Sequence, residues 1–260
     1  MAEVIVCENA QAAGELVGAH IAAQVEAQPT FTLGVATGST PMPVYQALHG
    51  HADAGVDFSR LTAFALDEYV GLPEGHPQAY REVVDREVTK PLGLDPARVH
   101  VPDGRREGIE TAGQRYEEAL TAHGGVDLQI LGIGTTGHIA FNEPGSSFAS
   151  LTRVKTLTEQ TRIDNARFFD SLDDVPLHCV TQGLGTIMRA RHLVLLAFGE
   201  NKADAVARAV EGPVTASMPG SAIQLHPHVT VVLDEAAATG LAHRDYYDWA
   251  YQHKPTWQEL

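Results

Sequence analysis

Short apolar runs alternate with longer stretches of helical periodicity along most of this chain. The runs are rich in aliphatic and β-branched residues, a composition that is typical of buried strands. Strands separated by helices predict an α/β fold, with an open, mainly parallel sheet that has helices on both faces, as in Rossmann-like proteins. The expected strands are 4–7, 31–36, 61–66, 99–101, 128–131, 193–198 and 229–233, and the expected helices are 9–28, 43–48, 80–89, 109–123 and 202–210.

One segment does not follow this alternation. Residues 144–180 are rich in Ser, Thr, Arg and Asp, and we expect them to be irregular. A connection of this length is too long to be a plain loop in a compact domain, and such segments are usually functional lids or small insertions. We therefore expect a lid around residues 150–180 of a single domain that spans residues 1–260.

Composition narrows the class of protein. The chain has 260 residues, of which 44% are hydrophobic and 20% are charged, as in an ordinary soluble protein that is large enough to bury one substantial core. Its net charge of -15 argues against nucleic-acid and anionic membrane partners, because both require a basic surface. Clustered positive residues therefore stand out in this chain.

The two cysteines, Cys7 and Cys179, have no metal-binding or redox spacing, which fits a reducing cytoplasm. The N-terminus has no apolar region typical of a signal peptide. No apolar run reaches the roughly 18 residues of a membrane span. We expect a cytoplasmic protein.

Small, hydroxylic or charged residues follow four of the expected strands. These clusters are 37–41, 67–69, 132–144 and 199–202. Because the carboxyl ends of parallel strands meet at one edge of a sheet, we expect the four clusters to converge on one site.

The loop 132–144 contains a histidine, His138, and a carboxylate, Glu143. Its glycines also match the G-x-G-x-x-G pattern of dinucleotide-binding proteins, but that pattern should begin a helix, and residues 142–145 break one. A metal site at His138 and Glu143 is a further alternative. It is disfavoured because no third ligand lies nearby at metal spacing and the segment is not helical.

Residues 37–41 and 67–68 each allow two interpretations. The first segment is compatible with a helix N-cap that has an early proline, and the same geometry also binds phosphate. Asp67 and Glu68 could be a solvated acidic pair. A carboxylate directly after an apolar run could instead be partly buried, and burial would raise its proton affinity toward that of a general base.

Basic residues favour an anionic ligand. Lys202, at a strand-to-helix junction, could be solvated or could reach an anion at the sheet edge. A positive lid above a hydroxyl-lined loop indicates a phosphorylated small molecule, and a base with an imidazole indicates proton transfer next to a carbonyl. The basic residues of the lid are Arg153, Lys155, Arg162 and Arg167, opposed between 153 and 167 only by Glu159 and Asp164.

Several of these segments, in the same order, resemble the glucosamine-6-phosphate deaminase family over nearly the whole chain. The resemblance implies conversion of glucosamine 6-phosphate and water to fructose 6-phosphate and ammonia, without a metal or organic cofactor. The motifs that carry it are 37–41 (TGSTP), 66–72 (LDEYVGL), 137–144 (GHIAFNEP), 161–162 with 165–169 (TR and NARFF) and 225–227 (LHP).

By matching motif, Asp67 resembles the base that moves a proton between C2 and C1, and His138 resembles the group that opens the sugar ring, oriented by Glu143. The chain departs from the family at Thr136, where Asp or Asn is frequent, and a threonine supplies only a hydrogen bond. The residues that resemble the substrate phosphate site are Thr37, Gly38, Ser39, Thr40, Arg167 and Lys202.

The resemblance also raises the question of regulation. In allosteric members of the family, N-acetylglucosamine 6-phosphate binds between subunits as an activator, which would require a homo-oligomer. The residues that resemble this second phosphate site are Ser146, Ser147, Arg153 and Lys155. Alternatively, these residues only stabilise the lid.

Two other functions compete with this one, a related enzyme activity and a non-catalytic binding role. A 6-phosphogluconolactonase would share the fold and a Gly-His loop, but we expect a different sequence after its histidine than Asn142-Glu143-Pro144. A non-catalytic phosphosugar sensor would carry a DNA-binding helix-turn-helix, for which 260 residues leave no room beside this core.

Overall fold

A sheet of seven strands lies at the centre of the computed structural model, which describes residues 2–258 and 260. All neighbouring strands in it are parallel, which confirms the expected α/β architecture. Their order across the sheet is β1 (Glu3–Cys7), β10 (Val229–Asp234), β9 (His192–Ala197), β6 (Leu128–Gly132), β2 (Thr32–Val35), β3 (Thr62–Ala65) and β5 (Val99–His100).

The central strands are buried along their whole length. Every residue of β2, β3 and β9 is buried, because helices flank the sheet and each of these strands has neighbours at both edges. Burial on both faces explains why these strands are continuous apolar runs without polar alternation. Such runs are the signal that made these strands predictable from the sequence.

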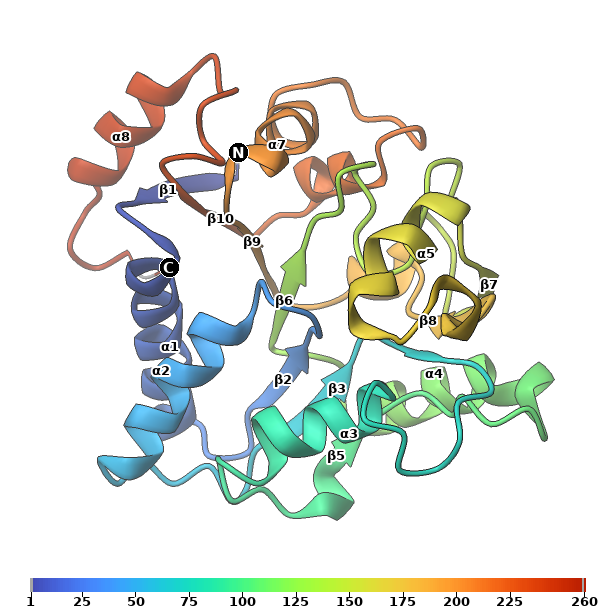
Figure 1. Ribbon diagram of the computed structural model, residues 1–260. Coiled ribbons are helices and arrows are strands. Elements are labelled where there is room, and N and C mark those ends of the chain that lie inside the picture. Colours follow the sequence, from blue (N-terminus) through green and yellow to red (C-terminus); the bar gives the residue numbers. More distant parts are fainter. Residues whose placement is uncertain (1, 259) are drawn as a thin grey trace.

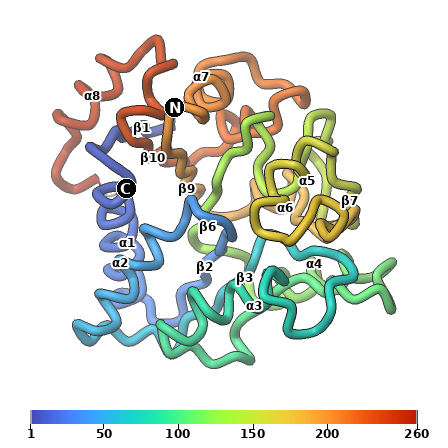
Figure 2. The backbone as a smooth tube through the Cα atoms, viewed as in Figure 1, coloured from blue at the N-terminus to red at the C-terminus, as the bar shows by residue number. Residues whose placement is uncertain are grey.

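Helices α1 (Ala10–Ala27) and α2 (Met42–Asp53) lie side by side at one side of the sheet, as both backbone views show (Figure 1 and Figure 2). Their close approach requires glycine on α1, because a Cβ atom at Gly14 would clash with Pro43 and one at Gly18 would clash with Ala47. The remaining helices are α3 (Tyr80–Val84), which continues as a π-helical turn (Asp85–Thr89), α4 (Ala112–Ala122), α5 (Glu159–Asn165), α6 (Leu184–Ile187), α7 (Ala203–Val210) and α8 (Arg244–Gln252).

A second, antiparallel sheet corrects the expectation that residues 144–180 are irregular. It consists of β4 (Asp67–Tyr69), β8 (His178–Thr181) and β7 (Arg153–Thr156), in that order. Of this part of the chain, β7, β8 and α5 lie together on the opposite side of the molecule from α1 and α2 (Figure 1). These strands are short and partly polar, and they pair with partners far away in the sequence, so no local apolar pattern marks them.

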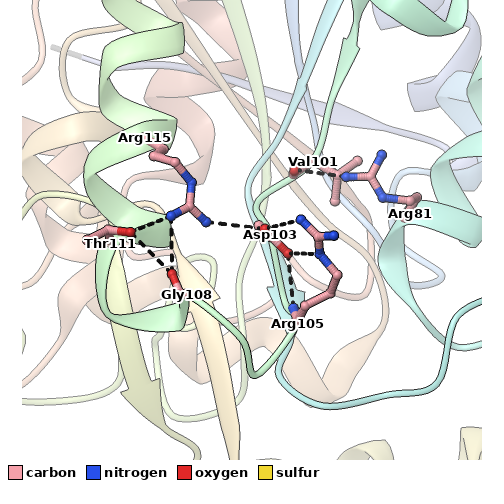
Figure 3. A network of polar contacts seen from close by, with 7 residues as sticks. All are labelled: Arg81, Val101, Asp103, Arg105, Gly108, Thr111 and Arg115. Carbon is pink, nitrogen blue, oxygen red and sulfur yellow. Dashed lines mark hydrogen bonds and ion pairs between the residues drawn. The ribbon is translucent and has the colours of Figure 1, made fainter.

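A polar network fastens the chain after β5 to α4 (Figure 3). Asp103 accepts hydrogen bonds from Arg105 Nη2 at 2.9 Å and from Arg115 Nη2 at 3.2 Å. The hydrogen bond from Arg105, with the charges of both guanidinium groups, lowers the pKa of Asp103 to about 2. Arg81, at the start of α3, donates to the carbonyl oxygen of Val101 nearby. The contact of Arg81 holds α3 against the chain that follows β5, and the contact of Arg115 holds α4 against the same chain.

Within the described residues, no helix combines the length and apolar character needed to cross a membrane. Cys7 and Cys179 are both free thiols.

Candidate active site

A cavity of about 510 Å³ lies at the carboxyl ends of the parallel strands. All four clusters that follow strands contribute to its wall, as the sequence pattern predicts. From the expected site residues, its lining contains Thr37, Gly38, Ser39, Thr40, Asp67, His138, Arg167 and Lys202. Thr136 and Glu143 lie behind His138 and support it through the contacts described below.

The loop between β2 and α2 presents its hydroxyl groups to this cavity. Gly38 has a φ of 91°, in the left-handed region that favours glycine, and open space surrounds the position of a Cβ atom there. The helix starts at Met42, with Pro41 at its N-cap and no side-chain capping bond. The loop therefore leads into the helix, as the N-cap interpretation expects, but none of its hydroxyl groups caps the helix.

Two cations reach the same cavity from distant parts of the chain. Lys202 follows β9, and the loop that carries it is fixed by the Gly199 amide, which donates to both carboxylate oxygens of Asp234 at 3.0 Å. Burial lowers the pKa of Lys202, the charge of Arg167 adds to this effect and that of Asp164 opposes it. Arg167 follows α5, so the segment 150–180 supplies one of the two cations.

Asp67 is buried, and so is Glu68, which makes the solvated-pair interpretation wrong. Burial, reinforced by the charge of Glu68, raises the pKa of Asp67 to about 8. Glu68 has a structural role. It accepts hydrogen bonds from the backbone amides of Tyr69, Tyr80 and Arg81 at 2.7–2.9 Å and thereby holds the first turn of α3. Of the two carboxyl groups, Asp67 is therefore the one that faces the cavity, and its pKa is elevated.

The loop after β6 forms a tight support for His138 and does not begin a helix, so the dinucleotide interpretation does not hold. Gly134 must be glycine, because a Cβ atom there would clash with the imidazole of His138. The Thr136 Oγ1 atom lies 2.9 Å from His138 Nδ1 and donates to Glu143 Oε2 at 3.3 Å. Glu143 Oε2 itself lies 3.4 Å from His138 Nδ1.

Two threonines, Thr158 and Thr161, contact the other oxygen of Glu143. Thr161 lies in a motif that carries the family resemblance, but neither threonine was expected in the site. Thr161 Oγ1 donates to Glu143 Oε1, and Thr158 Oγ1 lies 3.3 Å from the same oxygen. Burial would raise the pKa of Glu143, but the hydrogen bond with His138, together with the two threonine hydroxyls, holds it below its usual value. Glu143 is therefore a carboxylate that is bound on both sides.

An aromatic wall that no sequence pattern predicted closes part of the cavity. Tyr69, Tyr80 and Phe141 pack against one another, with ring centroids 4.8–6.0 Å apart. Asn165 of α5 donates to the Tyr69 hydroxyl at 3.0 Å, which connects α5 to this wall. Burial raises the pKa of Tyr69 to about 12, so its hydroxyl stays protonated at neutral pH.

The four residues that resemble a second phosphate site do not belong to the lining of this cavity as the described residues form it. Arg153 Nη1 donates to Asn142 Oδ1 at 2.7 Å, in the loop that carries His138. Ser146 is buried, Ser147 is exposed, and Lys155 is half-buried on β7. Among the described residues, no group of three or more His, Cys, Asp or Glu side chains is arranged to hold a metal ion.

Residues 7–232 match the model of the glucosamine-6-phosphate isomerase and 6-phosphogluconolactonase family. The chain belongs to this family. Within the family it is similar to glucosamine-6-phosphate deaminases, at 56% identity to that of Bifidobacterium longum, with 100% of both chains covered. It is 58% identical to the deaminase of Streptomyces avermitilis, over 99% of this chain and 100% of the relative.

Solved structures of the family agree with this assignment. The chain superposes on a monomeric glucosamine-6-phosphate deaminase with a TM-score of 0.89 and 38% identity, over 92% of this chain and 99% of that one. A 6-phosphogluconolactonase from Leishmania guyanensis shares the fold, with a TM-score of 0.73 at 22% identity, over 93% and 99% of the two chains.

Proposed function

We propose that this chain is a glucosamine-6-phosphate deaminase, which converts glucosamine 6-phosphate and water to fructose 6-phosphate and ammonia in amino-sugar catabolism. The observation that carries the proposal is the buried Asp67 carboxyl group, which faces the same cavity as His138 and the cations Lys202 and Arg167. Full-length identities of 56–58% to named deaminases support the same reaction.

His138 opens the sugar ring in this scheme. Its neutral imidazole passes a proton between the ring oxygen and the anomeric hydroxyl, which gives the open-chain aldehyde. Thr136 and Glu143 hold Nδ1 of the imidazole from behind, so Nε2 is the nitrogen available to the substrate.

Asp67 then moves the proton that isomerises the sugar. The ionised carboxylate removes the proton from C2, and the resulting carboxylic acid returns it to C1 of the enolamine. This leaves a ketimine at C2, which water hydrolyses to the ketone with release of ammonia. The scheme requires neither a metal ion nor an organic cofactor.

The loop 37–40 and the cations Arg167 and Lys202 bind the phosphate of the substrate. Charge-assisted hydrogen bonds at one end of the sugar fix C1 and C2 against Asp67, so that binding contacts are converted into orientation. We assign this activity to one domain, residues 1–260, whose lid spans about 150–180, and we place the protein in the cytoplasm because its two cysteines are free thiols.

We also propose a second anion site at Ser146, Ser147, Arg153 and Lys155, with N-acetylglucosamine 6-phosphate as activator of an oligomeric form. Its support is the hydrogen bond from Arg153 to Asn142, through which an anion that attracted Arg153 would act on the His138 loop. The same contact also fits a lid-stabilising role without regulation, and the two alternatives predict different saturation curves. The solved deaminase that resembles the chain is described as monomeric, so a test requires the oligomeric state to be measured first.

One assay tests the main proposal. Ammonia release from glucosamine 6-phosphate is measured with the purified chain, beside hydrolysis of 6-phosphogluconolactone. Ammonia release without lactone hydrolysis is the expected result. Lactone hydrolysis without ammonia would make the chain a lactonase, and binding of the sugar phosphate with neither reaction would make it a sensor.

A further inference from the structure

Glu143 is held from the lid as well as from its own loop. Its Oε2 atom faces Thr136 and His138, and its Oε1 atom accepts from Thr161 on α5. Thr161 is itself 3% exposed, so its hydroxyl is shielded from water. A hydroxyl that supplies a hydrogen bond to a buried carboxylate cannot be replaced by solvent when it is removed.

We propose that Thr161 is a positioning residue that acts through Glu143 to orient His138. The proposal rests on the proposed function insofar as His138 opens the sugar ring. Nothing in the sequence around residue 161 marks this role, because the two residues are 18 positions apart and meet only when α5 lies on the loop.

Thr161, and not Thr158, makes the dedicated contact. Thr158 is the N-cap of α5, and its Oγ1 atom accepts from the Thr161 amide at 3.1 Å. The same Oγ1 atom lies 3.0 Å from Thr161 Oγ1 and 3.3 Å from Glu143 Oε1. Thr158 therefore divides its hydroxyl between the helix and its neighbours, whereas Thr161 donates directly to the carboxylate.

The direction of the hydrogen bonds follows from the number of protons. A carboxylate only accepts, so the single hydroxyl proton of Thr136 goes to Glu143 Oε2. The Thr136 oxygen can then accept from His138 Nδ1, which must carry a proton. Nε2 is left with a free lone pair toward the cavity, the form that an acceptor of a hydroxyl proton needs.

Thr161 secures this arrangement by satisfying Oε1. With Oε1 bound by the lid, the carboxylate plane is fixed and Oε2 stays directed at Thr136 and His138. Without that donor, the buried Oε1 keeps only the longer contact with Thr158 Oγ1 at 3.3 Å, and rotation of the carboxylate toward another donor would release the imidazole. The position of α5 and the orientation of His138 are thereby coupled.

The test compares Thr161→Val, which removes the hydroxyl and keeps the branched shape, with Thr161→Ser, which keeps the hydroxyl. Thr156→Val is the matched control, since Thr156 is an exposed hydroxyl of the same lid. Two quantities are measured on each protein: steady-state ammonia release, and the 15N chemical shifts of the His138 imidazole, assigned with the help of His138→Gln.

For Thr161→Val we expect kcat to fall roughly 5- to 150-fold with KM within about twofold, as for loss of a buried hydrogen-bond partner. The nitrogen shifts should change from a protonated Nδ1 to a mixture of tautomers. Thr161→Ser should restore both quantities, and Thr156→Val should leave both at the wild-type values.

Wild-type kcat and unchanged nitrogen shifts in a folded Thr161→Val protein would overturn the proposal. If that variant does not fold, the wild-type spectrum still decides, because a protonated Nε2 with a bare Nδ1 contradicts the arrangement. A wild-type protein that releases no ammonia would reject the proposed function alone, since the imidazole shifts of the variants would still test the action of Thr161 on His138.

Discussion

Asp67 pairs with Thr181 across the antiparallel strands β4 and β8. The carboxyl group proposed as the base therefore belongs to the small antiparallel sheet. The residue before it, Leu66, still hydrogen-bonds to the main sheet through the Val35 carbonyl oxygen. Thr181 Oγ1 in turn accepts from the Phe141 amide at 3.1 Å, in the loop that carries His138. The base and the histidine are thus positioned by one network.

Replacement of Asp67 by asparagine should remove turnover and preserve sugar-phosphate binding. The amide cannot accept the C2 proton, and a general base typically contributes 10²–10⁴-fold to the rate. Ammonia release and calorimetric binding of fructose 6-phosphate measure the two effects separately. Near-normal turnover by a folded Asp67→Asn protein would reject the role of Asp67.

The pKa of about 8 for Asp67 predicts the pH dependence of activity. Only the ionised carboxylate is a base, so kcat/KM should rise with pH through about 8 and then level off. A profile of kcat/KM from pH 6 to 10 measures this limb. A plateau that already begins near pH 5 would contradict an elevated pKa for the base.

The same pKa predicts that stability falls with rising pH over the range in which activity rises. In the unfolded chain Asp67 has its ordinary pKa near 3.8, so between about pH 4 and pH 8 the folded state retains a proton that the unfolded state has lost. The burial of Asp67 thus lowers the free energy of unfolding progressively as pH rises across this range. Asp67→Asn should therefore raise Tm more at pH 8.5 than at pH 5, and calorimetry of both proteins at the two values tests the sign.

Loss of either cation of the proposed phosphate site should act mainly on KM. Lys202→Ala and Arg167→Ala each remove a charge-assisted hydrogen bond worth about 1.5–3 kcal/mol, or roughly a 10- to 150-fold increase in KM. Unphosphorylated glucosamine should be a very poor substrate for the same reason. Similar efficiency with glucosamine and its 6-phosphate would show that these residues do not bind phosphate.

The activator proposal makes a separable prediction. In a preparation shown to be oligomeric, N-acetylglucosamine 6-phosphate should shift the saturation curve for the substrate to lower concentrations. Arg153→Ala should remove this shift and leave the maximal rate unchanged. A curve that the effector does not change would restrict Arg153 to its structural contact with Asn142.

The sequence by itself determined the main sheet and the place of the site. Strands that are buried on both faces are continuous apolar runs, and hydroxyl, acidic and imidazole groups follow the runs that become β2, β3 and β6. Because parallel strands end at one edge, local pattern sufficed to place Thr37, Asp67 and His138 around one cavity.

Only the tertiary structure decided the pKa values and the hydrogen-bond partners of these groups. The burial of Asp67, and hence its elevated pKa, depends on what covers it, which a local pattern does not specify. The strand β8 pairs with β4, which joins Asp67 to Thr181 across more than a hundred positions in the chain, and β7 pairs with β8. The contact of Thr161 with Glu143 likewise forms only when α5 packs on the loop that carries Glu143. Long-range pairing and burial are properties of the packed molecule, whereas hydrophobic periodicity is a property of the chain.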